Sequence, residues 1–287
     1  MNKSNHPASL LVVATAMCAA LYAVGSYATA YIPSPWGFGQ FRPAVIIPSL
    51  FGAIFGPIPA AIGAAMGTLI ADSTKHGTLY MGSLLAAVPG NFIGFYIFGY
   101  ILKKKFNWTR FIFASVTTLV IANAIVAFLY VFLFKAIYMQ ALAFSPDALT
   151  FLSFGLTIYW FVTMLPFILL VTPLLIRAVA YAMPTIVPEE VRVNSLETEI
   201  PKNSFSLATI APGVIMLLIG LATTFTPLGA FTASTNKLSG TLFIELMYYI
   251  GGGALITIGS IALVKQRWKN HGKVPCGGSR RHFRRVS

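Results

Sequence analysis

Residues 41–72 read FRPAVIIPSLFGAIFGPIPAAIGAAMGTLIAD, and this stretch decides how the chain is built. From Pro43 to Ala71 it holds 29 residues without one charged side chain, but Gly56-Pro57-Ile58-Pro59 interrupts it near the middle. A membrane-spanning helix uses about 20 apolar residues, so the run is too long for one ordinary span and too short for two. Because proline removes a helical hydrogen bond, the interruption favours two short helices.

Small residues recur every three or four positions after the interruption, which places them on one helix face. They are Gly56, Ala60, Gly63, Gly67 and Ala71. In lipid, such a face lets the backbone of a second helix approach closely. The row ends at Asp72. A close-packed helix therefore places a carboxylate at the membrane boundary, and this arrangement suggests a transport protein.

The composition predicts an all-α, polytopic membrane protein. Hydrophobic residues make up 57% of the chain and charged residues 9%, against about 25% charged in a soluble domain. Mean hydropathy is +0.78. The apolar stretches are helical, because a backbone in lipid must satisfy its hydrogen bonds within the segment. They lie at 8–31, 43–55, 57–71, 80–102, 111–134, 150–176, 207–228 and 239–264.

A polar segment divides these eight helices into six and two. Residues 182–206 carry four of the seven acids of the chain and three prolines. We therefore expect a six-helix membrane core at 1–181, a cytoplasmic linker at 182–206, a two-helix membrane appendix at 207–264 and a basic cytoplasmic tail at 265–287.

The distribution of basic residues predicts the topology. With both termini inside, 16 of the 20 Lys and Arg residues are cytoplasmic, as the positive-inside rule requires. The same count results if residues 43–71 form one helix and the N-terminus lies outside, because Lys3 and Arg42 exchange sides. The proline break favours the inside N-terminus. The basic tail then contacts anionic lipid, and we expect no nucleic-acid partner.

Several kinds of chemistry find no support in the sequence. Cys18 and Cys276 lie too far apart in the predicted topology to pair, and the four His residues are scattered. No phosphate-binding G-x-x-x-x-G-K-[ST] motif, metal-ligand cluster or nucleophile–base pair occurs. We therefore expect no enzyme activity, no metal and no cofactor bound by this chain.

The loop at 32–42 is a candidate ligand cap. Trp36, Phe38 and Gln40 can cover a small aromatic ligand, and Arg42 can pair with an anionic group. The alternative is an aromatic belt at the membrane interface with a snorkelling arginine.

Two amides lie near the middle of predicted spans. Asn91 and Asn123 need partners at that depth, so they either bond each other across helices or face a ligand cavity. Tyr159 and Trp160, in the outer half of the sixth helix, are candidates for ligand contact or for packing.

Two acids also have two possible roles each, one in binding or transport and one in structure. Asp72 either accepts a hydrogen bond from a ligand or pairs with Arg42 and pins two helix ends together. Glu245 is the one acid well inside a predicted helix, which makes it a functional candidate, but it can also pair with Lys237 at the outer interface.

The first helix carries a flat alanine face that is suited to docking another helix. The face consists of Ala16, Ala19, Ala20 and Ala23. Spacing alone leaves open whether the partner helix belongs to this chain or to another protein.

With these residues, the sequence resembles the substrate-binding S component of energy-coupling factor (ECF) vitamin transporters over roughly residues 8–180. The motifs that carry the resemblance are Ala16/Ala20, Phe41-Arg42-Pro43, Phe55-Gly56-Pro57, Gly63-x-x-x-Gly67-x-x-x-x-Asp72 and Pro89-Gly90-Asn91-Phe92. Their order and spacing together are more specific than any one of them. The helices at 207–264 depart from this family, whose members typically end after six helices.

The resemblance implies a substrate-specificity subunit of an ATP-driven importer in a prokaryotic plasma membrane. It implies a vitamin or related micronutrient bound at the outer face, with contacts from helices four to six and from the loop after helix one. The predicted contacts are Trp36, Gln40, Arg42, Asn91, Asn123, Tyr159 and Trp160. The alanine face would dock onto a transmembrane coupling (T) protein, which two ATPase subunits drive.

Two other functions stay open at this point. A self-sufficient secondary transporter would use Asp72 or Glu245 for proton coupling. A non-transporting membrane scaffold would use the small-residue faces to bind other proteins. The sequence does not name the ligand, since riboflavin, thiamine, biotin and a queuosine precursor all fit.

Overall fold

A computed structural model describes residues 6–34, 37, 39–142, 144–193, 202–227 and 242–271. Almost all of these residues are helical, and six helices are long and apolar enough to cross a membrane. The predicted all-α, polytopic membrane fold is confirmed. Trp36, Phe38 and Lys237 lie outside the described residues, so the predictions that concern them stay untested.

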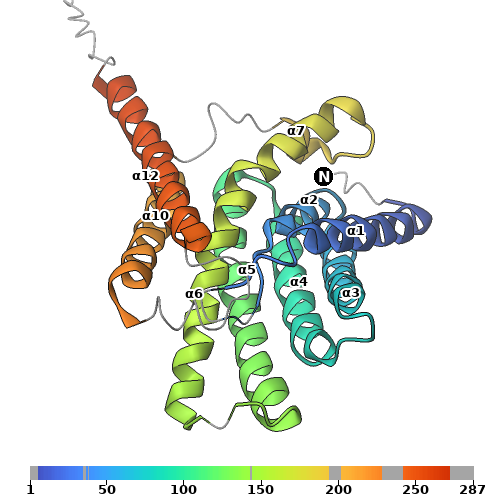
Figure 1. The fold of residues 1–287 in the computed structure, drawn as a ribbon. Coiled ribbons are helices and arrows are strands. Elements are labelled where there is room, and N and C mark those ends of the chain that lie inside the picture. The colour runs from blue at the N-terminus through green and yellow to red at the C-terminus, as the bar shows by residue number, and fades with distance from the viewer. Residues whose placement is uncertain are drawn as a thin grey trace, which may run out of the picture.

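In order along the chain, the helices are α1 (Ala8–Ala28), η1 (Pro43–Val45), α2 (Ile46–Phe55), α3 (Pro57–His76), η2 (Ser83–Ala87), α4 (Val88–Lys104), α5 (Trp108–Phe128), η3 (Leu129–Tyr138), α6 (Pro146–Leu170), α7 (Thr172–Ala182), α8 (Glu189–Val193), α10 (Lys202–Phe225) and α12 (Leu242–His271). After the central helices the chain returns to α2 with α7 before it reaches α10 and α12 on the far side (Figure 1).

The apolar run that follows Arg42 is indeed broken into two helices. Helix α2 ends at Phe55, and Gly56 has a φ of 89°, a conformation that glycine adopts readily. Pro57 then opens α3 at the first helical position, where its missing N–H costs nothing. The predicted break at the prolines is confirmed.

The small-residue face of α3 packs against α1. A Cβ placed on Gly63 would collide with the Cys18 side chain, and one on Gly67 would lie 2.7 Å from the carbonyl oxygen of Ala19. Only glycine permits such an approach at these two positions. The close helix contact that the spacing predicted is therefore made within the chain, between α1 and α3.

The outer helices flank a central group. Helices α1 to α3 lie on one side of α4, α5 and α6, and the α10–α12 pair lies on the other (Figure 1). Within that pair, a Cβ on Gly252 would lie 2.7 Å from the carbonyl oxygen of Gly213, so two glycines set the distance between the helices. Helix α10 also packs on α6 and α5. The domain boundaries at 181/182, 206/207 and 264/265 remain predictions.

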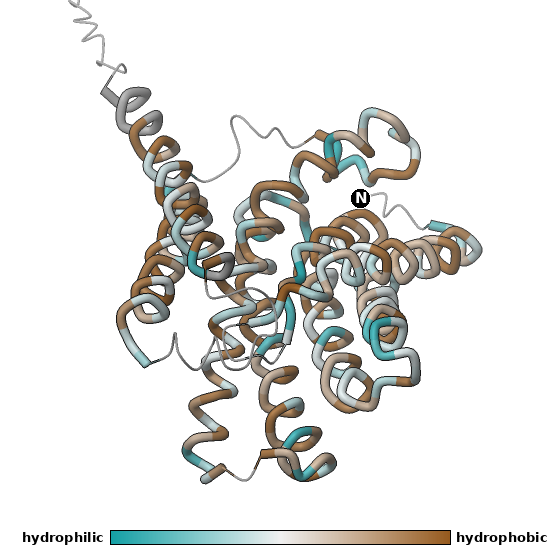
Figure 2. Tube along the Cα trace, in the orientation of Figure 1, coloured by the Kyte–Doolittle hydropathy of each residue, from teal (hydrophilic) through white to brown (hydrophobic). Residues whose placement is uncertain are grey.

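Hydrophobic residues run along most of the helices, and polar residues gather near several helix ends (Figure 2). Large apolar side chains also lie on the outside, for example Val24, Phe113 and Leu218. In water such a surface would be unfavourable, whereas lipid tails solvate it.

Two predicted helices contain stretches of π-helix that the sequence did not indicate. Helix α4 is preceded by η2, and α5 continues into the ten-residue η3, both with π-helical geometry. These two stretches pack against each other. Short π-helical segments often occur at functional sites, because they change which side chains share a face.

Candidate functional site

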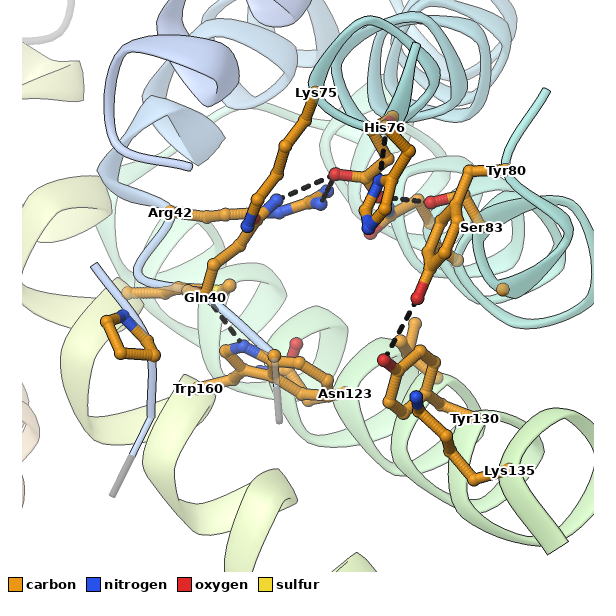
Figure 3. A pocket seen from close by; sticks show the side chains of 18 of the residues that line it. Gln40, Arg42, Lys75, His76, Tyr80, Ser83, Asn123, Tyr130, Lys135 and Trp160 are labelled. Carbon is orange, nitrogen blue, oxygen red and sulfur yellow. Dashed lines mark hydrogen bonds and ion pairs between the residues drawn. The ribbon is translucent and has the colours of Figure 1, made fainter. Parts of the chain in front are cut away.

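A cavity of about 330 Å³ lies among α3, η2, η3, α6 and the segment that joins α1 to η1 (Figure 3). This volume falls within the usual range for small-molecule sites. The lining residues are Tyr22, Pro33, Gly37, Gly39, Gln40, Arg42, Asp72, Lys75, His76, Tyr80, Gly82, Ser83, Ala87, Asn91, Asn123, Val126, Tyr130, Lys135, Trp160 and Met164.

The segment between α1 and η1 turns back on itself and brings its polar residues to the cavity. Pro33 and Gln40 form an antiparallel bridge, and the Phe41 amide donates to the carbonyl oxygen of Ile32 over 2.8 Å. The hydroxyl of Thr29 donates to the carbonyl oxygen of Phe41, also over 2.8 Å. The end of the segment is therefore tied to its beginning, and Gln40 is fixed against the cavity.

Trp160 anchors this segment to α6. Its indole Nε1 donates to the carbonyl oxygen of Gln40 over 3.1 Å, as Figure 3 shows. The neighbouring Gly39 has a φ of 71°, and a Cβ there would lie 2.5 Å from the Trp160 ring. Glycine is thus required both by the backbone conformation and by the closeness of the indole.

The charged centre of the cavity is an ion pair between Arg42 and Asp72. Arg42 is 9% exposed and Asp72 is 6% exposed. Arg42 also donates to the hydroxyl of Thr68. The carboxylate accepts two further hydrogen bonds, from Gln40 Nε2 over 2.7 Å and from the Ser83 hydroxyl. Of the two roles considered for Asp72, pairing with Arg42 is present in the structure.

The surroundings keep this arginine charged. Burial lowers the pKa of the Arg42 guanidinium, but attraction to the Asp72 carboxylate outweighs that effect, so the pKa lies above its ordinary value. A buried pair with its remaining donors and acceptors bonded holds its geometry, because breaking it leaves an uncompensated charge.

Both predicted amides line the cavity. A Cβ on Gly94 of α4 would lie 2.5 Å from the Cβ of Ala122, so α4 and α5 approach closely beside them. Asn123 is only 5% exposed, and its amide Nδ2 has no hydrogen-bond partner within the part of the chain that the structure describes. An unpartnered buried donor is costly unless something else accepts from it. Asn123 is therefore the strongest candidate for a ligand contact.

Five of the seven predicted contacts thus meet at one cavity: Gln40, Arg42, Asn91, Asn123 and Trp160. Tyr159 does not line it. The Tyr159 side chain is fully buried elsewhere, and its hydroxyl has no hydrogen-bond partner among the described residues. Trp36 lies outside the described residues. The assignment of all seven as ligand contacts remains a proposal.

Other lining residues were absent from the predicted set. His76 stacks on Tyr80 with 3.8 Å between ring centroids, and the Tyr80 and Tyr130 hydroxyls bond each other over 3.1 Å. Lys135 Nζ lies 5.7 Å from the centre of the Tyr130 ring. Tyr130 and Lys135 are five residues apart, a spacing that aligns side chains in a π-helix but not in an α-helix. Helical periodicity in the sequence therefore gave no signal for them.

The four alanines of α1 differ in their exposure in the structure. Ala16 and Ala20 are exposed, whereas Ala23 is buried and Ala19 is half-buried where Gly67 of α3 approaches it. Only the exposed half of the predicted docking face is open to another protein, and its partner remains a proposal.

Among the described residues, no group of His, Cys, Asp or Glu side chains is arranged to hold a metal ion. The arrangement offers instead a flat aromatic ring, an amide donor, hydroxyls and fixed charges around one cavity. Such a set suits non-covalent recognition of a small polar molecule.

A protein-family model described as "ECF-type riboflavin transporter, S component" matches residues 8–180, which run from the start of α1 into α7 and include every residue that lines the cavity. No curated protein and no solved structure matches the chain. The match covers more than half of the chain, in agreement with the motifs between Ala16 and Phe92. The chain belongs to the family of ECF-type riboflavin transporter S components, and it is a transport protein of the membrane, not an enzyme.

Proposed function

We propose that this chain captures a flat, vitamin-type heterocycle in the cavity from the outer side of a prokaryotic plasma membrane. The observation that carries the proposal is that the Asn123 amide Nδ2 has no hydrogen-bond partner among the described residues, in a cavity that Trp160 also lines. Riboflavin is the first ligand to try, because the family description names it.

The indole and the amides that line the cavity are suited to binding a flat ligand. Stacking on an indole contributes about 0.5–1.5 kcal/mol beyond the buried area, and each amide hydrogen bond about 0.5–1.5 kcal/mol. The ion pair of Arg42 and Asp72 holds the connecting segment to α3, so these contacts are arranged before the ligand arrives. Such preorganisation reduces the entropy lost on binding.

We further propose that accumulation of the substrate needs a T protein and two ATPase subunits. The sequence has no phosphate-binding loop, and the exposed Ala16 and Ala20 of α1 offer a smooth surface for a partner helix. Asp72 is engaged by Arg42, Gln40 and Ser83, which favours a structural carboxylate over a proton-coupling one.

The orientation of the chain is part of the proposal. Both termini lie in the cytoplasm, so the cavity faces outward and most basic residues face inward. Single cysteines at Leu79, between α3 and η2, and at Tyr181, near the end of α7, test this in a background without Cys18 and Cys276. Both positions are exposed. An impermeant thiol reagent should label Leu79→Cys on intact cells and not Tyr181→Cys, and the reverse result would contradict the orientation.

The function is tested by purifying the chain and identifying bound small molecules by mass spectrometry. Uptake of the identified compound is then measured in vesicles that contain the chain alone or the chain with its T protein and ATPases. We expect binding by the chain alone and accumulation only with all partners and ATP. Accumulation by the chain alone that an uncoupler abolishes would instead establish secondary transport, and absence of any bound compound would favour a scaffold.

A further inference from the structure

Three exposed aromatic rings form a continuous strip along α4. Phe92, Tyr96 and Tyr100 follow one another at intervals of four residues, which places them on one side of the helix. The ring centroids of Phe92 and Tyr96 lie 6.4 Å apart with 14° between the ring planes, and those of Tyr96 and Tyr100 lie 6.3 Å apart with 11°. The three residues are 39%, 39% and 49% exposed. Nearly parallel rings therefore stand in a row on the outside of the helix.

A lysine continues the strip at its end. Lys104 is the last residue of α4, four positions beyond Tyr100, and its Nζ lies 5.4 Å from the centre of the Tyr100 ring. Cation–π attraction favours this position of the ammonium, because the face of the ring is negative. A cation thus stands where the row of rings ends.

Further basic residues surround this end of the strip. Lys103 and Lys105 flank Lys104 and are exposed, and Arg110 lies in the first turn of α5, where its Nη1 donates to the carbonyl oxygen of Lys105 over 3.4 Å. Helix α8 brings Glu190 to the same end, where the carboxylate accepts from a backbone amide of the α4–α5 connection over 3.4 Å. One acid offsets part of the charge of four basic residues, so this end of the strip attracts anions.

The strip has the length of one membrane leaflet. Helix α4 rises about 18 Å between Phe92 and Lys104, and half of the hydrocarbon core of a bilayer is about 15 Å thick. Ser83–Lys104 is one of the candidate spans, so the strip occupies the half that ends at the basic residues. An aromatic belt lies at the level of the headgroups, whereas Tyr96 lies about 12 Å along the helix from Lys104. A belt therefore does not account for the strip.

The shape of the strip favours a lipid over a helix of another protein. Helix α4 packs against α3 and α5 (Figure 1), and the three rings project from its exposed side. Close helix contacts in a membrane use small residues, so a row of projecting rings keeps a second backbone away. A flexible acyl chain can instead lie along the rings. The hydroxyl of Tyr100 needs an acceptor at this depth, and the ester oxygens of a phospholipid supply one.

We infer that α4 binds an anionic phospholipid at this strip. The phosphate compensates the positive charges around Lys104, and one acyl chain follows the rings toward Phe92. In the orientation proposed above, the lipid belongs to the cytoplasmic leaflet, whose anionic headgroups are attracted by basic residues beside a spanning helix. None of the four residues of the strip lines the substrate cavity, so this site and the proposed function stand or fall separately.

A photoreactive lipid locates the site. Phosphatidylglycerol and phosphatidylcholine with the same diazirine-labelled acyl chain are each added as a minor component to phosphatidylcholine nanodiscs that contain the full chain. After illumination, the cross-linked residues are identified by mass spectrometry of peptides. Residues 207–214 of α10 serve as the reference, because exposed Leu207 and Val214 lie in the same leaflet in the proposed topology and report the general enrichment of anionic lipid around a basic protein.

The measured quantity is the labelling by phosphatidylglycerol divided by that by phosphatidylcholine. We expect this ratio to be at least about fivefold higher at residues 92–100 than at residues 207–214, the effect of one basic residue near an anionic headgroup. Equal ratios at the two surfaces, or no labelling of residues 92–100 by either lipid, would overturn the inference. The second result would show that something other than lipid covers the strip.

Variants assign the preference to the strip. Lys104→Gln should lower the ratio at residues 92–100 about fivefold, whereas Lys202→Gln, which removes the same charge at the start of α10, should leave it unchanged. Tyr100→Leu interrupts the row of rings and should also lower the ratio. Phe113→Leu, on a 60% exposed ring of α5, is its matched control and should behave as the wild type. Unchanged ratios in both Lys104→Gln and Tyr100→Leu would overturn the assignment.

Discussion

Arg42 and Asp72, 30 positions apart in the chain, form a buried ion pair that joins the segment after α1 to the end of α3. The same carboxylate accepts a hydrogen bond from Ser83 at the start of η2. One acid therefore ties together three elements of the cavity wall, and the shape of the cavity depends on it.

Removing this acid should destabilise the fold. Asp72→Asn leaves the guanidinium of Arg42 buried without its counter-charge, and we expect the free energy of unfolding to fall by about 3–5 kcal/mol. Thermal and denaturant unfolding of the purified protein in detergent measure this. Glu189→Gln, on an exposed acid of α8, is the control and should change stability by less than about 0.5 kcal/mol.

A double variant tests more strictly whether the ion pair stabilises the fold. Arg42→Gln combined with Asp72→Asn removes both charges, so its loss of stability should be smaller than the sum of the two single losses. Additive losses, or an Asp72→Asn variant as stable as Glu189→Gln, would show that the pair does not hold the cavity wall.

Gly39 offers a test of the contact between the connecting segment and α6. Gly39 and Gly77 have nearly the same φ, 71° and 73°, but a Cβ on Gly39 meets the Trp160 ring and one on Gly77 meets nothing within 4 Å. Both alanine variants incur the backbone cost of about 1 kcal/mol. Gly39→Ala must also displace the indole, so ligand affinity should fall at least tenfold in this variant only. Equal affinities in the two variants would mean that Trp160 does not shape the site.

The sequence was sufficient to predict the helices and the break at Gly56-Pro57, because both follow from local composition. An apolar stretch of sufficient length forms a spanning helix, and a proline interrupts a helix or begins one. Both effects depend on neighbouring residues and not on the rest of the fold. The close contact of α3 with a second helix was predictable for the same reason, since Gly63 and Gly67 lie on one face.

The cavity was only partly predictable. Asn91 and Trp160 stood out as polar or aromatic residues within predicted spans, and Gln40 as part of a loop that can cover a ligand. However, the bond from Trp160 to Gln40 joins residues 120 positions apart. No local pattern specifies such a contact. Lys135 was missed because its position on the cavity wall depends on the π-helical geometry of η3. The hydrophobic pattern indicated an α-helix, in which Tyr130 and Lys135, five residues apart, do not share a face.

The proposed docking surface on α1 is tested with a large side chain. Ala20→Trp should abolish ATP-driven uptake in vesicles that contain the T protein and ATPases, because a ring there keeps the helix backbones apart. Substrate affinity of the isolated chain should change less than about twofold, since Ala20 is exposed and does not line the cavity. Ala16→Trp should give the same result.

Leu21→Trp is the matched control, because Leu21 is 48% exposed and lies a third of a turn away from Ala20 on the same helix. It should transport normally. Normal transport by both alanine variants would place the docking surface elsewhere, and loss of ligand binding in the isolated Ala20→Trp protein would show that the face serves internal packing.

The most direct test of the account is the amount of small molecule that the purified chain retains. Asn123→Leu removes an amide whose Nδ2 has no partner among the described residues, so we expect stability to be unchanged or slightly higher. The retained compound should fall below a tenth of the wild-type amount. Asn107→Ala removes the N-cap of α5, whose side chain accepts from the Arg110 amide over 2.7 Å, and it should lower stability by about 1 kcal/mol while retention stays at the wild-type level. Retention is measured by mass spectrometry per mole of folded protein. Equal retention by Asn123→Leu and the wild type would contradict the assignment of this cavity as the substrate site.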